Sequence, residues 1–234
     1  MRVLQGLLSP LPVVTVLSAV LLITPGLLDG VWIWPRAWIF LAVYGGGGVL
    51  ASGLLAVLRP ESFRVRQQGI VARPEKKQPL IDALGLVLFT AFMLSWIAFI
   101  PLDVFRLKLL PPPSFAIQVT GIVAVVAGLA ITYVAIAQNR FAAPTIHDQS
   151  GEGQQVIQTG LYGLVRHPFY AGGLLVYAGA PLWLGSYAGS IAAVGFLAMT
   201  LARIIIEERY LREHLPDYAD YARRVRARLI PGVL

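Results

Sequence analysis

Apolar residues in this sequence form long, nearly uninterrupted stretches instead of alternating with polar residues. A helix needs about 20 mostly apolar residues to cross the roughly 30 Å hydrocarbon core of a bilayer. Four stretches have that length: Leu11–Leu28, Ala37–Leu58, Leu80–Ile100 and Phe115–Ala137. Each of them predicts a membrane-spanning helix.

A fifth apolar stretch, Phe169–Ile206, is too long for one crossing and contains Pro181, Gly185 and Gly189. Such residues interrupt helices, so we expect a helical hairpin that turns near Gly185 to Gly189. The pattern as a whole predicts an all-α, polytopic bundle of about six transmembrane helices, with a C-terminal helical hairpin and a cytosolic tail. The first apolar stretch lacks a clean small-residue cleavage site, so we interpret it as a retained span and not a signal peptide.

The composition agrees with a lipid-exposed surface. Hydrophobic residues make up 57% of the chain and charged residues 13%, against about 25% charged in soluble domains. The net charge of +7 is typical of proteins that bind nucleic acid or face anionic lipid, and the apolar content favours the bilayer as partner over nucleic acid. There is no cysteine, which excludes disulfides, thiolate nucleophiles and cysteine-ligated metals.

Lysine and arginine are distributed unevenly among the predicted loops. Six lie in Arg59–Pro79 and six follow Ile206, whereas Asp29–Arg36 holds one and Asp103–Pro113 holds two. Because basic loops stay in the cytosol, we expect a multi-pass protein of the cell's inner or plasma membrane whose active site faces the cytosol. The run Gly45–Gly48 predicts a close helix-packing face and leaves room for a homodimer.

Polar residues suited to chemistry concentrate after Gln138. The sequence therefore divides into N-terminal transmembrane helices, 1–137, and a C-terminal region, 138–234, with a loop, the hairpin and the basic tail. In the loop, Gly151 and Gly153 allow close approach of a ligand, although an ordinary loop explains them equally well. Arg166 and His167 precede a helix that Pro168 can start, which indicates either an anion site or a hydrogen-bonded interfacial histidine.

A second group of polar residues begins at Arg203 and contains two pairs of oppositely charged residues at helical spacing. Arg203 and Glu207 lie four residues apart, and Glu208 and Arg212 repeat the spacing. Two stabilising pairs at the membrane boundary would account for them. Arg203, however, lies inside the apolar run, where a charge is costly and usually functional.

Taken together, these motifs resemble a known family. The order Thr-Gly-Leu-Tyr, Arg-His-Pro-Phe-Tyr, Arg-x-x-x-Glu-Glu, Tyr-x-x-Tyr and Ile-Pro is similar to that of isoprenylcysteine carboxyl methyltransferase-like membrane enzymes. Phospholipid methyltransferases share the Gly-x-Gly and Glu-Glu elements. The resemblance covers roughly Gln138 to Pro231, and the N-terminal spans resemble nothing specific.

The resemblance implies that S-adenosylmethionine binds within the membrane protein itself, with S-adenosylhomocysteine as product and without a metal. It places Arg203 near the reacting centre. Where the acceptor is an amine, thiol or hydroxyl that needs a base, the chemistry makes His167 or Glu207 the candidate. The residues that fall on the family's cofactor-binding positions are Gly151, Gly153, Tyr162, Arg166, His167, Pro168, Tyr170, Glu207 and Glu208.

The expected function is therefore an S-adenosylmethionine-dependent methyltransferase that acts on a lipophilic acceptor. An isoprenylcysteine carboxylate, a phospholipid or another isoprenoid lipid all remain open as the acceptor. Two alternatives also remain: an NADPH-dependent membrane lipid or sterol-type reductase, which ends in a similar Arg-His-Pro stretch, and a non-catalytic membrane scaffold.

Overall fold

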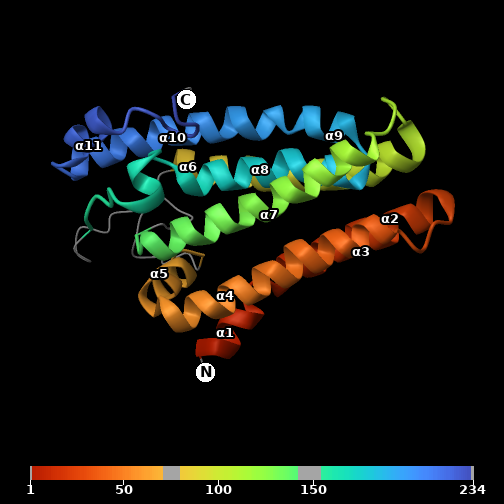
Figure 1. The fold of residues 1–234 in the computed structure, drawn as a ribbon, viewed down its shortest axis with the longest axis horizontal. Helices are drawn as coiled ribbons and strands as arrows, with labels where there is room; N and C mark the ends of the chain where they lie inside the picture. Colours follow the sequence, from red (N-terminus) through yellow and green to blue (C-terminus); the bar gives the residue numbers. More distant parts are fainter. Residues whose placement is uncertain (1, 71–79, 142–153, 233–234) are drawn as a thin grey trace.

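The computed structural model describes residues 2–70, 80–141 and 154–232, and in this part of the chain the regular elements are all helices (Figure 1). The elongated helices lie roughly side by side in a bundle. In chain order they are α1 (Arg2–Leu8), α2 (Leu11–Asp29), α3 (Pro35–Phe40), the π-helical turn η1 (Leu41–Gly46), α4 (Gly47–Leu58), α5 (Pro60–Ile70), α6 (Leu80–Leu102), the π-helical turn η2 (Asp103–Leu107), α7 (Phe115–Gln138), the 3₁₀ turn η4 (Gly160–Gly163), α8 (Pro168–Leu184), α9 (Tyr187–Ala192), α10 (Val194–His214) and α11 (Tyr218–Arg224).

Within the described residues, five helical segments are long and apolar enough to cross a membrane. They are Val3–Asp29, Pro35–Leu58, Val87–Leu107, Phe115–Gln138 and Tyr187–His214. Four of them contain or overlap the four predicted spans, and the fifth is the second arm of the predicted hairpin. The prediction of a polytopic helical membrane protein is confirmed.

The first arm of the hairpin is α8, which has 17 residues. It ends at Leu184, and Gly185 follows with φ of 103°, a left-handed conformation that favours glycine. Ser186 then accepts a hydrogen bond from the backbone N–H of Gly189 at 2.8 Å and so caps α9. The turn therefore falls where the sequence predicts it.

Small residues bring α7 and α8 into close contact along their length. A Cβ atom added at Gly128 would lie 2.5 Å from the carbonyl oxygen of Gly172, and one added at Gly179 would lie 2.5 Å from that of Gly121. Only glycine permits this separation, which is typical of helix packing in membranes. The start of α8 is thereby held at a fixed place beside the end of α7.

The predicted packing face at Gly45–Gly48 is used inside the chain. A Cβ atom at Gly45 would come within 3.1 Å of Val14 on α2. The Tyr133 hydroxyl of α7 donates to the carbonyl oxygen of Gly48 at 3.1 Å. The homodimer stays a prediction.

Polar contacts define the two ends of the bundle. At one end, buried Asp103 accepts a 2.5 Å hydrogen bond from Ser186, and the Trp183 indole donates to the carbonyl oxygen of Arg36 at 2.8 Å. The opposite end carries α5, η4, the start of α8 and α11 (left in Figure 1). The motifs singled out from the sequence gather at this second end, which we call the motif end.

Candidate functional site

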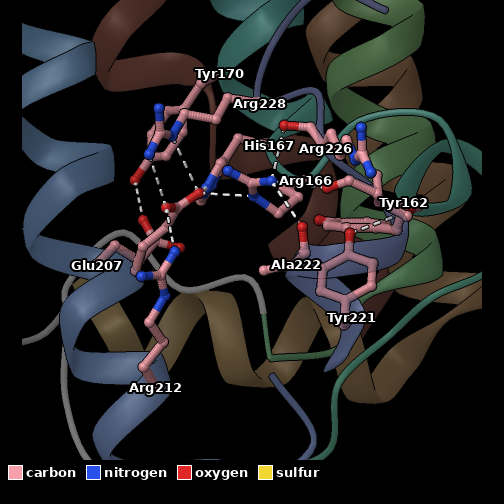
Figure 2. A network of polar contacts seen from close by, with 12 residues as sticks. Tyr162, Arg166, His167, Tyr170, Glu207, Arg212, Tyr221, Ala222, Arg226 and Arg228 are labelled. Atoms are coloured by element: carbon pink, nitrogen blue, oxygen red, sulfur yellow. Dashed lines mark hydrogen bonds and ion pairs between the residues drawn. The ribbon is translucent and has the colours of Figure 1, made fainter. Parts of the chain in front are cut away.

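Glu208 on α10 is only 3% exposed and is the centre of a buried ionic network. Figure 2 shows this network of polar contacts. Arg166 donates to the Glu208 carboxylate through Nε at 2.7 Å, and His167 Nε2 lies 3.3 Å away. Arg228 and Arg212 approach the other oxygen at 3.3 and 3.5 Å. The Arg-His-Pro and Glu-Glu motifs, about 40 residues apart in the chain, therefore meet, and the predicted Glu208–Arg212 pair is present.

Arg166 also holds the segment that follows α11. Its Nη1 donates to the carbonyl oxygens of Val225 and Arg226 at 2.7 and 2.8 Å. The backbone N–H groups of Arg166 and His167 donate to carbonyl oxygens of residues 227–228 at 3.0 and 2.9 Å. A guanidinium presents several donors in a rigid fork, so Arg166 can bind the acid and the tail at once. The tail is thus fastened across the entrance to α8.

A second, less buried set of contacts joins the remaining motif residues. The Tyr170 hydroxyl donates to Glu207 Oε2 at 2.7 Å and accepts from Arg203 Nε at 3.0 Å. All three residues are half-buried. Tyr170 therefore links the predicted pair Arg203 and Glu207, and these side chains retain access from outside the buried network.

Three tyrosines line the tail side of the motif end. The Tyr221 hydroxyl donates to the carbonyl oxygen of Tyr162 at 2.8 Å, and burial raises the pKa of Tyr221 to about 12. Burial likewise raises the pKa of Tyr162 and of Tyr218. These phenols remain neutral hydrogen-bonding groups at physiological pH.

Tyr218 differs from its neighbours because its hydroxyl has no hydrogen-bond partner among the described residues, although only 3% of the residue is exposed. It lies within electrostatic reach of the carboxylates of Glu207 and Glu208. A buried hydroxyl without a partner is costly, so this atom is a candidate to bind a ligand. The sequence placed Tyr218 in the Tyr-x-x-Tyr motif without a role, and that motif was the only signal for it.

The structure brings together the predicted site residues that lie within its described part. Pro168 begins α8 directly after His167, as the sequence predicts. His167 is buried and hydrogen-bonded, which agrees with the second interpretation given above. Gly151 and Gly153 lie outside the described residues, so their assignment to the cofactor stays a prediction.

Residues 116–217 match the family described as phospholipid methyltransferase. This region is a phospholipid methyltransferase-family domain. Such domains are membrane methyltransferases that use S-adenosylmethionine, and the resemblance stated from the motifs is thereby confirmed. The match begins at α7, so the domain includes the helix on which α8 packs.

One curated relative is the cobalt-zinc-cadmium resistance protein CzcN of Cupriavidus metallidurans. It is 36% identical over 77 residues, which is 31% of this chain and 34% of the relative. The match thus spans about a third of the length of that protein.

Proposed function

We propose that this protein is an integral membrane methyltransferase that takes S-adenosylmethionine from the cytosol and a lipophilic acceptor from the bilayer. The observation that carries the proposal is the meeting of the family's separate motifs at one end of the bundle, where Glu207 and Glu208 face the start of α8. An isoprenylcysteine carboxylate, a phospholipid and another isoprenoid lipid are the candidate acceptors.

The side chains present suit the cofactor. S-adenosylmethionine offers an ammonium group and ribose hydroxyls as donors, and it supplies an already activated methyl group. Glu207 accepts one hydrogen bond from Tyr170 and keeps other acceptor positions. The Tyr218 hydroxyl has no hydrogen-bond partner among the described residues. We assign Glu207 and Tyr218 to cofactor binding, together with Tyr162, Tyr170 and the predicted glycines.

The remaining motif residues divide into positioning and substrate roles. Arg166 and His167 bind the Glu208 carboxylate, and Arg166 also binds the tail. We therefore assign these three residues to holding the site in shape. Arg203 is half-buried beside Tyr170 and would orient the acceptor. Because displacement at a sulfonium mainly requires alignment of the two reactants, such positioning accounts for much of the rate. Glu207 is the candidate base where the acceptor is an amine.

Charge supports a cytosolic site. The described basic residues of α5, the Arg-His-Pro motif and the tail lie at the motif end. Arg36, Arg106 and Lys108 lie at the other end, where they contact Trp183, Asp29 and Asp103 respectively. Basic segments remain in the cytosol, where the water-soluble cofactor is made available.

Calorimetry on the detergent-solubilised protein tests the proposal directly. S-adenosylhomocysteine should bind and NADPH should not, and labelled cofactor should transfer its methyl group to a lipid extract. Tyr218→Phe should weaken S-adenosylhomocysteine binding about threefold to tenfold, since one neutral hydrogen bond is lost. The control is Tyr187→Phe, at the other end of the bundle. Binding of NADPH with no binding of S-adenosylhomocysteine would favour the reductase alternative.

A further inference from the structure

Arg66 lies outside the matched domain and still reaches its motif end. It is a half-buried residue on α5, and its guanidinium carbon lies 5.1 Å from the centre of the Phe169 ring. Phe169 is part of the Arg-His-Pro-Phe-Tyr motif, next to Tyr170, with 5.5 Å between their ring centres. An N-terminal element thus places a positive charge beside the proposed site.

The position of Arg66 is built into the fold. Phe63, on the same helix, is 6% exposed and belongs to a core cluster with Leu55 of α4 and Ile136 of α7. Phe169 packs against the same cluster. Arg64, two residues earlier, is exposed. The orientation of α5 therefore directs Arg66 inward and leaves Arg64 exposed to water.

The surroundings of Arg66 are aromatic. Its charge interacts with the phenols of Tyr44, Tyr133, Tyr162 and Tyr170, and burial lowers its pKa. Within residues 2–70, 80–141 and 154–232 it forms no ion pair with a carboxylate, whereas Arg166, Arg212 and Arg228 all pair with Glu208. A half-buried cation of this kind is costly unless an anion joins it.

We propose that Arg66 binds the anionic head group of the lipophilic acceptor, a carboxylate or a phosphate. The guanidinium fork of an arginine matches either group. A second arginine, Arg203, donates a hydrogen bond to the hydroxyl of the neighbouring Tyr170. α5 packs on the apolar helices α4 and α7, so an acceptor whose tail lies among these helices brings its head group to Arg66. The assignment deepens the proposed function and rests on it for the identity of the ligand as acceptor.

The test compares three amphiphiles on the full chain in detergent. N-acetyl-S-farnesylcysteine carries a carboxylate, dioleoylphosphatidylethanolamine carries a phosphate, and hexadecylamine carries no anionic group. Binding is read as the ligand-dependent rise in apparent melting temperature, alongside S-adenosylhomocysteine affinity by calorimetry. The variants are Arg66→Gln and Arg66→Lys, with Arg64→Gln as the matched control.

The wild type should bind at least one anionic amphiphile, and Arg66→Gln should weaken that binding about tenfold or more. Arg66→Lys should recover part of it, and Arg64→Gln should resemble the wild type. Binding of hexadecylamine and of S-adenosylhomocysteine should be unchanged in every variant. A response limited to the farnesyl probe identifies a carboxylate, and one limited to the phospholipid identifies a phosphate.

Three results would overturn the assignment. They are equal binding of the anionic probes by wild type and Arg66→Gln, a loss of S-adenosylhomocysteine affinity in Arg66→Gln, and an equal loss for all three amphiphiles with a lower melting temperature of the free protein. The last would show that the contact with Phe169 is only structural. If S-adenosylhomocysteine never binds but anionic amphiphiles bind through Arg66, the proposed function fails and the anion site stands.

Discussion

Replacing Glu208 by glutamine should loosen the motif end severely. The side chain is 4% exposed and lies 2.7 Å from Arg166, 3.3 Å from Arg228 and 3.5 Å from Arg212. The amide removes the negative charge and points donor hydrogens at guanidinium donors. Leaving a buried charge without its partner costs about 3–5 kcal/mol. Because Arg166 keeps its carbonyl partners, we expect the lower part of that range.

For a chain of this size, each kcal/mol of free energy of unfolding shifts the melting temperature by about 2–4 °C. A cost of about 3 kcal/mol therefore predicts a fall of roughly 6–12 °C in the apparent melting temperature, measured by intrinsic fluorescence in detergent.

The matched control is Glu61→Gln. Glu61 lies 3.6 Å from Arg140, and the two side chains are 61% and 45% exposed. Exposed pairs contribute about 0–1 kcal/mol, so the control should melt within about 4 °C of the wild type. If Glu208→Gln melts like the control, the ionic network does not hold the tail. Unchanged melting with a large loss of S-adenosylhomocysteine affinity would make Glu208 a ligand-binding residue, as the family resemblance implies.

Two further predictions concern the substrate residue and the topology. Arg203→Lys keeps the charge but not the planar fork, so turnover should fall about tenfold to a hundredfold while S-adenosylhomocysteine affinity and melting stay normal; near-normal turnover would refute a role in orienting the acceptor. Because the chain has no cysteine, Arg64→Cys, Arg223→Cys and Leu110→Cys each introduce a single label site. The first two should react with an impermeant maleimide only from the cytosolic side and the third only from the other side, and labelling of positions 64 and 223 from opposite sides would contradict the arrangement.

The helices could be predicted because lipid imposes a simple rule. Each spanning segment must be predominantly apolar and must satisfy its own backbone hydrogen bonds. The predicted Phe115–Ala137 accordingly differs from α7 by one residue at its end. The hairpin turn was readable for a similar reason, since Gly185 adopts a conformation that few other residues tolerate.

The site was only partly readable, because its contacts join distant parts of the chain. Motif spacing identified Arg166 and Glu208, but it did not show that Arg166 also donates hydrogen bonds to carbonyl oxygens of the tail. Arg66 looked like one of many topology-setting arginines, and only the packing of Phe63 on α4 and α7 turns it inward. Tyr218 carried no signal beyond its motif, since the lack of a partner for its hydroxyl among the described residues is visible only in the folded chain.

The fastening of the tail by Arg166 has a consequence for biogenesis. The carbonyl oxygens that Arg166 binds belong to residues translated after every apolar helix described here. Until α10 and the tail have been translated, Arg166, which lies just before the first arm of the hairpin, lacks both Glu208 and those carbonyls. The motif end is therefore among the last parts of the protein to form, and membrane insertion alone does not produce a finished site.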